Sequence, residues 1–235
     1  MSLLNKNMPV IAGYDPIVDM GINYSNEIDF GCIELGDSVL HIGCGTGDYT
    51  FTIRGIVADS GRVIGIDISD DNVALARQNC GYFGYNNVTF FQKDIANLQF
   101  GDASFDVVVC NYALNLFPNK EQIYKEFHRV LKPNGKLIIA DAFVVGDVQR
   151  DALDAIVASY YKMAKLPQCD NVIVNAQGEM ESLLINAGFK SIVLANERDV
   201  DVENGEMLLY LPYDMIDGFV NSGCSIRLVN EYGTK

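Results

Sequence analysis

The fold of this chain is decided by the stretch Val39-Leu40-His41-Ile42-Gly43-Cys44-Gly45-Thr46-Gly47, early in its 235 residues. The first four residues form a short, mainly apolar run, which predicts a buried strand. The glycines at alternate positions allow the backbone to turn sharply and to approach a ligand closely, because no Cβ atom stands in the way. A strand that enters such a turn and then a helix can hold a dinucleotide, a nucleoside or no ligand at all.

The acidic residues that follow this turn favour a nucleoside. Asp67 lies 20 residues after Gly47, at the end of the next apolar run, where a carboxylate can accept hydrogen bonds from two ribose hydroxyls. A dinucleotide fingerprint needs a third glycine where Asp48 follows Gly43, and an acid beside a helix N-terminus suits a pyrophosphate badly. Asp94, after the third apolar run, can accept a hydrogen bond from an adenine amine or can be a solvated acid in a loop.

From residue 38 onward, short apolar runs alternate with amphipathic stretches, which is typical of a parallel sheet with crossover helices. We expect an α/β, Rossmann-like, doubly wound and mostly parallel seven-stranded sheet with helices on both faces. The predicted strands are residues 38–42, 62–68, 88–92, 105–110, 136–141, 191–196 and 225–229. The predicted helices after the one that follows Gly47 are residues 70–82, 120–131, 150–164 and 179–186, the last of them ending at Gly188.

Two segments need separate mention. Pro133-Asn134-Gly135 has the chemistry of a turn, so it predicts the end of the helix over 120–131. Residues 207–213 are apolar enough for a strand, a buried turn of helix or part of a pocket wall, and these alternatives stay open.

No long linker, repeat or low-complexity tract divides the chain, which predicts a single domain over residues 1–235. Within it we expect an N-terminal lid over 1–34, a ligand-binding core over 35–141 and a substrate-side half over 142–235. The oligomeric state stays open.

The composition predicts a soluble, cytoplasmic protein. There are 17 Lys and Arg against 31 Asp and Glu, and the net charge of −14 repels phosphate backbones and anionic lipids, so no nucleic-acid or membrane partner is expected. The longest apolar runs are strand-sized, shorter than the roughly 18 residues of a membrane span. Residues 1–10 lack the apolar core and cleavage site of a secretory signal.

The cysteines predict a reducing compartment and no metal site. None of the six forms a C-x-x-C pair, and the chain has only two histidines. Cys44 and Cys110 fall within apolar runs, where a free cysteine acts as a small hydrophobe.

Residues 35–141 resemble the class I S-adenosylmethionine-dependent methyltransferases, in the branch that acts on small molecules. Five motifs in the order of that family carry the resemblance, and they are residues 40–47, 63–69, 92–98, 105–117 and 126–137. The resemblance implies that S-adenosylmethionine is the cofactor and that a small molecule accepts the methyl group.

The resemblance also implies which residues contact that cofactor. The glycine turn would approach the methionine and ribose, Asp67 would hold the ribose, and Ile68 would pack against adenine. Asp94 and Ile95 would address the adenine edge, and Asn111 would lie near the methionine. With His41, the implied cofactor-binding residues are Gly43, Cys44, Gly45, Gly47, Asp67, Ile68, Asp94, Ile95 and Asn111.

His41 departs from the family pattern. The family usually has an acid at this position, which helps to neutralise the methionine ammonium. A neutral imidazole can accept a hydrogen bond from that ammonium, whereas a charged one repels it, so we expect affinity to fall as the pH drops through about 6.5. The alternative is a structural histidine at the end of a strand.

No catalytic residue is assigned from the sequence. A sulfonium methyl group is already activated, so its transfer needs mainly in-line approach and exclusion of water rather than a dedicated base. His128 lies within a predicted helix and is expected to be structural. Tyr112 is a candidate pocket residue, and Tyr14 is a candidate lid residue.

Residues 109–120 resemble the arsenite methyltransferases within this family, which hold As(III) on cysteine thiolates, the soft ligands that it prefers. Cys32, Cys169 and Cys224 are the candidate thiols because they lie outside the predicted core strands. However, Cys169 lacks the usual glycine-rich surroundings, and the N-terminal thiol motif is not recognisable. We therefore expect scattered thiols and another small acceptor, such as a quinone-like ring, a carboxylate or an amine.

Two further functions stay open. A nicotinamide-dependent oxidoreductase is disfavoured by Asp48 and the missing third glycine. A binding module could keep the fold and the cofactor without transferring a methyl group.

Overall fold

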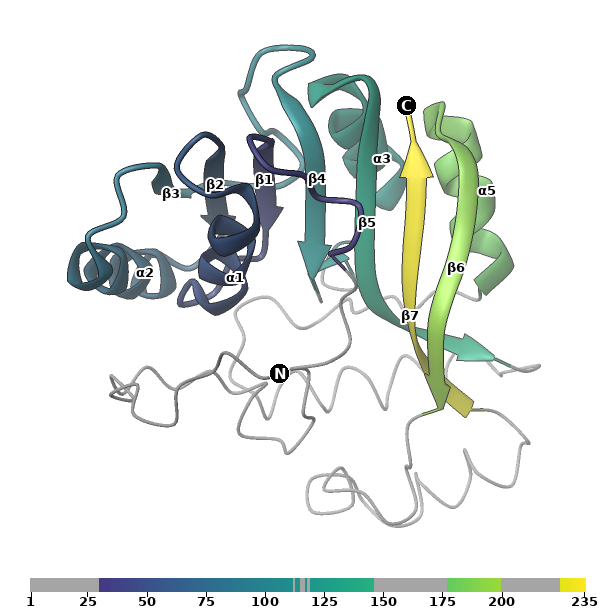
Figure 1. The fold of residues 1–235 in the computed structure, drawn as a ribbon. Helices are drawn as coiled ribbons and strands as arrows, with labels where there is room; N and C mark the ends of the chain where they lie inside the picture. Colours follow the sequence, from purple (N-terminus) through teal and green to yellow (C-terminus); the bar gives the residue numbers. More distant parts are fainter. Residues whose placement is uncertain (1–29, 112, 115–116, 118, 146–176, 200–224) are drawn as a thin grey trace, which may run out of the picture.

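The computed structural model describes residues 30–111, 113–114, 117, 119–145, 177–199 and 225–235. Seven strands form one sheet in the order β3-β2-β1-β4-β5-β7-β6 (Figure 1). They are β1 (Ser38–Ile42), β2 (Arg62–Asp67), β3 (Val88–Gln92), β4 (Phe105–Asn111), β5 (Leu131–Val145), β6 (Lys190–Asp199) and β7 (Ser225–Thr234).

The sheet is parallel apart from one strand. β1 pairs with β2 and β4, β2 with β3, and β4 with β5, all in parallel. β7 runs antiparallel between β5 and β6. The predicted doubly wound and mostly parallel seven-stranded sheet is therefore confirmed.

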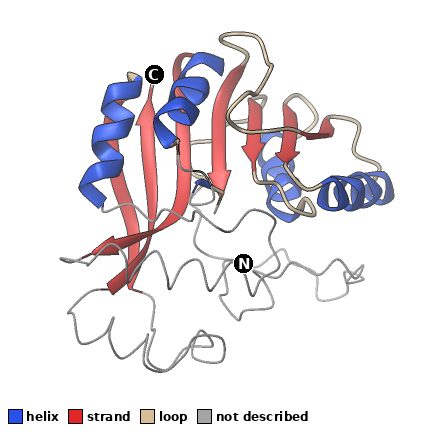
Figure 2. Cartoon of the chain, turned by 180° about the vertical axis from the view of Figure 1, so that it is seen from behind, coloured by secondary structure: helices blue, strands red, loops and turns tan. Residues whose placement is uncertain are grey.

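Helices cover both faces of the sheet, as Figures 1 and 2 show from opposite sides. α1 (Asp48–Val57) and α2 (Asp70–Phe83) pack on one face, and α3 (Lys120–Val130) and α5 (Gln177–Ala187) pack on the other. Successive residues of a strand face opposite sides, so β1 sends Val39 to the α1 side and Leu40 and Ile42 to the α3 side. Both faces of these strands are buried, which explains why the strands are nearly continuous apolar runs.

Local chemistry sets the ends of the helices. The Ser69 hydroxyl accepts a hydrogen bond from the Asn72 N–H at 3.2 Å and caps α2, which ends at Gly84 in the left-handed region. The Asn119 side chain caps α3 in the same way, through the Gln122 N–H at 3.4 Å. Gly188, with φ of 103°, follows α5 where the sequence predicts the end of that helix.

The predicted end of the helix over 120–131 is confirmed, since α3 ends at Val130, but residues 133–135 belong to an irregular start of β5 rather than to a turn before it. β4 advances from Phe105 to Val107 while β5 advances from Leu131 to Lys136, so extra residues bulge out of the pairing. Asn134 takes a positive φ of 61° there. Its N–H donates to the carbonyl of Lys235, and the Lys235 N–H donates to Gly135, so a distant segment satisfies the bulged backbone.

The other predicted elements differ from the structure mainly at their ends. β5 extends to Val145, and β7 and β6 extend to Thr234 and Asp199, beyond the predicted strands. The sequence does not reveal these ends, because a strand continues for as long as it pairs with its neighbours, whatever its composition. The predicted helix over 150–164 and the undecided segment 207–213 lie outside the described residues.

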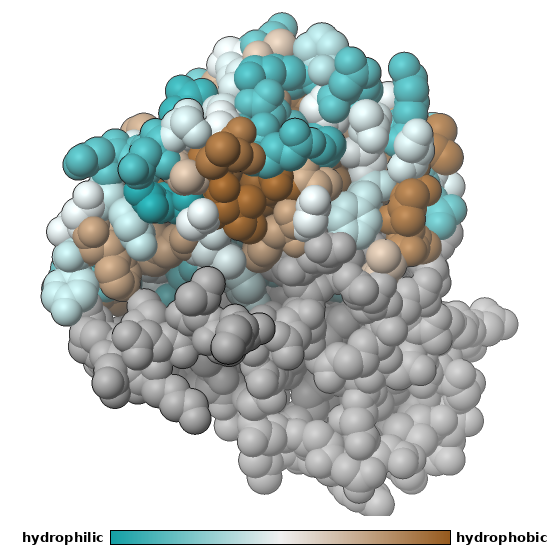
Figure 3. All heavy atoms as spheres, viewed as in Figure 1, coloured by the Kyte–Doolittle hydropathy of each residue, from teal (hydrophilic) through white to brown (hydrophobic). Residues whose placement is uncertain are grey.

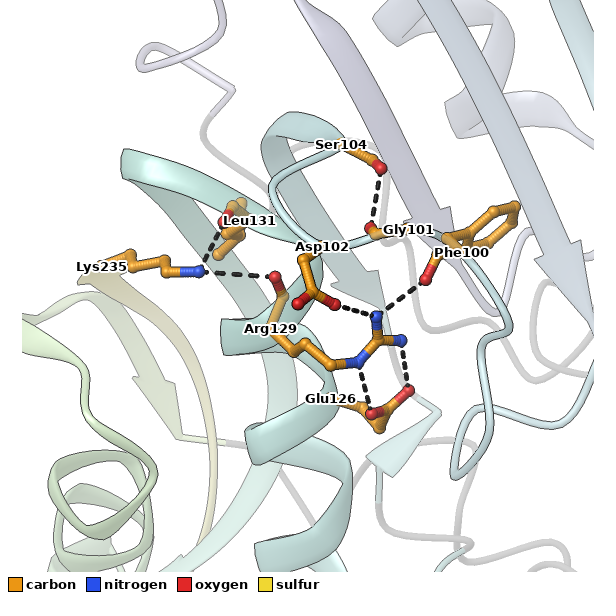
Figure 4. Close-up of polar contacts among 8 residues, drawn as sticks. All are labelled: Phe100, Gly101, Asp102, Ser104, Glu126, Arg129, Leu131 and Lys235. Carbon is orange, nitrogen blue, oxygen red and sulfur yellow. Dashed lines mark hydrogen bonds and ion pairs between the residues drawn. The ribbon is translucent and has the colours of Figure 1, made fainter.

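Arg129, in the fifth family motif, ties α3 to the loop before β4 (Figure 4). Its guanidinium donates to both carboxylate oxygens of Glu126 at 2.8 Å, to Asp102 at 2.7 Å and to the Phe100 carbonyl at 2.8 Å. The Lys235 ammonium donates to the carbonyls of Leu131 and Arg129, next to the end of α3. This part of the motif therefore stabilises the amino edge of the sheet, which is the edge at which the parallel strands begin.

The surface of the described part mixes hydrophilic and apolar side chains, with apolar side chains gathered in separate patches on the face shown in Figure 3. No helix among the described residues is long and apolar enough to cross a membrane.

Replacing Phe127 by Ala tests how far the α3 layer stabilises the fold. Phe127 is fully buried among the residues of α3, β5 and α5, so the substitution loses apolar contacts and leaves a cavity. We expect the free energy of unfolding to fall by about 3–5 kcal/mol, measured by urea denaturation. Tyr82→Ala is the control, since Tyr82 is 66% exposed and its loss should cost less than about 1 kcal/mol.

Candidate cofactor site

The position of the site follows from the order of the strands. From β1 the chain continues to β2 and β3 on one side, whereas β4 and β5 lie on the other side. Ligands of open α/β sheets bind outside the carboxyl ends of the strands at such a switch point. The glycine turn 43–47 follows β1 there, and Asp67 and Asn111 end the strands on either side of β1.

The glycines of the turn are required by packing inside the protein. A Cβ atom on Gly43 would lie 2.9 Å from the Ala113 Cβ and 3.1 Å from the Asn111 carbonyl. A Cβ atom on Gly47, whose φ is 103°, would lie 2.9 Å from the Phe51 ring. The first and third glycines therefore bring the turn against β4 and α1, and they would do so with or without a ligand.

The Asp67 carboxylate is fixed by two backbone N–H groups. One oxygen accepts from Gly45 at 2.9 Å, in the turn after β1, and the other accepts from Ser69 at 2.9 Å, in the turn after β2. Asp67 remains partly exposed. Each carboxylate oxygen has lone pairs to spare, so this side chain can still accept hydrogen bonds from two vicinal hydroxyls.

The residues next to Asp67 suit an adenine ring in part. Ile68 is 42% exposed, although it is a large apolar side chain, and its carbonyl accepts a hydrogen bond from the Gln92 side chain at 3.1 Å. Asp94 is exposed and turns one oxygen back to the Ala96 N–H at 2.9 Å. Ile95 is only 3% exposed and packs in the core, so only its backbone can address the adenine edge.

Asn111 and Cys44 lie at the end where the methionine is expected. The Asn111 side-chain oxygen is buried and has no hydrogen-bond partner among the described residues, which suits the donor of an ammonium group. Burial, with the nearby charge of Asp67, raises the pKa of the Cys44 thiol well above its usual value. Cys44 is therefore a protonated, buried thiol, as expected of a small hydrophobe, and so is Cys110.

His41 is buried beneath α1. It is 1% exposed, and its Nδ1 lies 2.7 Å from the Thr50 hydroxyl oxygen, while Nε2 has no partner among the described residues. Burial lowers the pKa of His41 from 6.5 to about 3. The expected change of affinity near pH 6.5 is therefore wrong, because this imidazole stays neutral across that range.

Three residues that the sequence did not single out shape the site. Thr50 holds the ring of His41, and the Asn79 amide of α2 donates to the Thr46 carbonyl at 3.2 Å and steadies the glycine turn. Gly65 of β2 leaves room for Phe90, because a Cβ atom would lie 2.6 Å from that ring. The Thr50 and Asn79 contacts join segments that only the fold brings together.

Cys32 does not lie with the other site residues. Its carbonyl accepts from the Lys136 ammonium at 2.8 Å, and Lys136 pairs with Val107 near the start of β4, at the amino edge of the sheet. Tyr14, Tyr112, Cys169 and Cys224 lie outside the described residues. The described residues contain no group of three or more metal-ligating side chains.

This geometry defines a class of protein, a doubly wound α/β protein whose switch point carries groups that suit a nucleoside. A fixed carboxylate suits a ribose, an exposed isoleucine suits an adenine, and an orphaned buried amide oxygen suits an ammonium. These features fit S-adenosylmethionine.

Comparisons with known proteins agree with this class. A family described as "Methyltransferase domain" matches residues 33–194. The "Ubiquinone/menaquinone biosynthesis C-methyltransferase UbiE" of Blochmanniella pennsylvanica is 30% identical over 188 residues, covering 74% of this chain and 71% of that protein. An "Arsenite methyltransferase" of Aquipseudomonas alcaligenes is 36% identical over 115 residues, covering 46% of this chain and 33% of that protein.

A solved structure shows the same fold. The arsenic (III) S-adenosylmethionine methyltransferase of Chlamydomonas reinhardtii superposes with a TM-score of 0.68 at 22% identity, covering 95% of this chain and 75% of that one. The chain spans about a third to a half of the length of the arsenite methyltransferases that it matches in sequence.

The chain belongs to the methyltransferase domain family. The resemblance to class I S-adenosylmethionine-dependent methyltransferases is thereby confirmed, as is S-adenosylmethionine as the cofactor of this class. The family does not support the nicotinamide-dependent alternative.

Replacing Asp67 by Ala tests the ribose contact. The variant loses a charged acceptor that is held in place by Gly45 and Ser69, so the affinity for S-adenosylhomocysteine should fall at least about tenfold in titration calorimetry. Asp71→Ala removes an exposed acid from the first turn of α2 and should bind normally. Unchanged affinity in a folded Asp67→Ala variant would refute the ribose contact.

The pKa of His41 predicts a pH dependence of stability. The folded pKa of about 3 lies below the unfolded value of 6.5, so the unfolded state binds the proton first as the pH falls. The free energy of unfolding should therefore decrease by about 2 kcal/mol between pH 7.5 and pH 5 because of this group. Urea denaturation at the two pH values should show this decrease in the parent but not in His41→Asn. His128 is present in both proteins, so its titration does not contribute to the difference. Equal slopes would contradict a neutral, buried His41.

Proposed function

We propose that this chain transfers the methyl group of S-adenosylmethionine to a small-molecule acceptor by in-line displacement. The observation that carries the proposal is the fixed carboxylate of Asp67, which joins the turns after β1 and β2 beside the exposed Ile68. Such an arrangement recognises an adenosine without phosphates, and the family membership supplies the methyl transfer.

The protein's own residues have a limited set of tasks in this reaction. The bound cofactor supplies a methyl group that its sulfonium already activates, so no catalytic base is assigned. Asp67 would hold the ribose, and the side-chain oxygen of Asn111 would accept a hydrogen bond from the methionine ammonium. These contacts would fix the donor while the acceptor approaches from the carboxyl edge of β4.

For the acceptor, we propose a quinone-type ring ahead of arsenite. Coverage does not separate the two acceptors, because the quinone C-methyltransferase matches 74% of this chain and two arsenite methyltransferases match 46% and 81% of it. The preference rests instead on the thiols that an arsenic site needs. Cys32, one of the three candidate thiols, lies at the amino edge of the sheet, far from the turn after β1. An arsenic site would therefore have to form without it.

Arsenite remains the second candidate because of the 36% identity to an arsenite methyltransferase. As(III) needs at least two thiolates close together near the methyl donor. Cys169 and Cys224 are the thiols that would have to supply them.

A methyl-transfer assay separates the two acceptors. The purified chain is incubated with S-adenosylmethionine and either a short-chain 2-substituted 1,4-naphthoquinol or arsenite with glutathione, and S-adenosylhomocysteine is measured. We expect formation of this product with the naphthoquinol and background formation with arsenite.

The cysteine variants provide the control. Arsenite-dependent turnover that disappears in Cys169→Ser and Cys224→Ser, but persists in Cys32→Ser, would overturn the preference for a quinone-type ring. Binding of S-adenosylhomocysteine with no transfer to any acceptor would favour a binding module without turnover.

A further inference from the structure

One ring nitrogen of His41 is hydrogen-bonded, and the other has no hydrogen-bond partner among the described residues. Nδ1 lies 2.7 Å from the Thr50 hydroxyl oxygen, whereas Nε2 is buried without a hydrogen-bond partner among the described residues. The side chain is 1% exposed, so water at the surface does not satisfy that atom. A buried polar atom that lacks a partner in the protein points to a ligand or a bound water.

The hydrogen bond to Thr50 decides which nitrogen carries the proton. Thr50 is fully buried, and His41 is its one side-chain hydrogen-bond partner in the described part of the chain. If Nδ1 carried the proton and donated it, the hydroxyl proton of Thr50 would have no acceptor. If Thr50 donates to Nδ1, every proton of the pair except one is satisfied, and that one is on Nε2. The second arrangement leaves fewer unsatisfied groups, so Nε2–H is the free donor.

The surroundings of the ring restrict where its acceptor can lie. In the sheet, His41 stands between Gly65 of β2, which has no side chain, and Val109 of β4. Toward the amino edge lie the apolar side chains of Val39 and Ile53. The glycine turn begins two residues after His41, so the carboxyl edge is the side of the ring on which the nucleoside site lies.

We propose that His41 donates a hydrogen bond from Nε2–H to the methionine carboxylate of the cofactor, directly or through one bound water. This inference rests on the proposed use of S-adenosylmethionine. An acid at this position would accept a hydrogen bond from the methionine ammonium, whereas a neutral imidazole with its proton on Nε2 can only donate. His41 therefore changes which group of the methionine is recognised from β1, and the ammonium is left to Asn111.

The tautomer can be tested without any ligand. His41 and His128 are the only two histidines, so a protein labelled with 15N-histidine gives few ring signals, and His41→Asn assigns them. At neutral pH, the His41 ring should show a protonated Nε2 and an unprotonated Nδ1. A ring protonated on Nδ1 overturns the proposal, whether or not the cofactor binds.

The carboxylate contact can be tested by calorimetry with two ligands. The first is S-adenosylhomocysteine, and the second is its analogue without the carboxylate, 5′-(3-aminopropylthio)-5′-deoxyadenosine. The parent protein should bind the second ligand at least about tenfold more weakly, as expected for a lost hydrogen bond to a charged group. The His41 Nε2 signal should also shift with the first ligand and much less with the second.

Two variants at the same position separate the ring nitrogens. His41→Asn can replace Nδ1 but does not reach the position of Nε2, so it should bind both ligands with nearly equal affinity. His41→Gln places an amide donor near the position of Nε2 and should keep part of the difference. Thermal unfolding shows that each variant is folded.

The outcomes separate failure of this inference from failure of the proposed function. If the parent binds S-adenosylhomocysteine but His41→Asn discriminates between the ligands as the parent does, the carboxylate contact is refuted and the cofactor assignment stands. If the parent binds neither ligand, both the cofactor assignment and the contact are refuted.

Discussion

The Asp67 carboxylate is the interaction on which the arrangement of the site depends. It accepts from the Gly45 N–H in one turn and the Ser69 N–H in the next, so it joins the ends of two parallel strands and the starts of two helices. Backbone donors at the start of a helix favour an anion, and here a side chain of the protein takes that place. The turn after β1 is therefore already shaped, and a nucleoside that binds there meets an acceptor that needs no reorganisation.

The glycines of this turn are required by packing within the protein. In an isolated sequence, alternate glycines indicate space for a ligand, yet Gly43 and Gly47 are needed because β4 and the Phe51 ring occupy the places of their Cβ atoms. Residues without a Cβ atom therefore let the turn pack closely against the sheet and also leave its backbone accessible to a ligand. The shape of the turn on the ligand side is set by its packing against β4 and α1 on the other side.

His41 shows how a buried polar residue can be tolerated in a parallel sheet. Burial lowers its pKa to about 3, so the ring is neutral, and Thr50 of α1 satisfies one of its nitrogens. A neutral ring avoids the large cost of a buried charge, but it cannot balance the charge of an ammonium as an acid would. A neutral imidazole at this place in β1 therefore offers a ligand a different distribution of charge from the acid that the family resemblance implies.

The sequence by itself predicts the seven strands, with bounds close to the observed ones for β1 to β4, and the four helices of the described part, because buried parallel strands are apolar runs and the turn motifs are local. Its motifs also predict the family. The sequence also predicts Asp67 and Asn111 as site residues, since each stands where an apolar run ends, and the structure places them at the carboxyl ends of the two strands beside β1. The tertiary structure decided what local patterns do not contain. The start of β5 became a bulge because Lys235, about a hundred residues away, satisfies its backbone. Cys32 lies at the amino edge of the sheet and Ile95 lies in the core. Tertiary packing decides both positions, and the local sequence does not indicate them. The protonation of His41 was decided in the same way, by a helix that buries the ring and by a threonine that hydrogen-bonds to it.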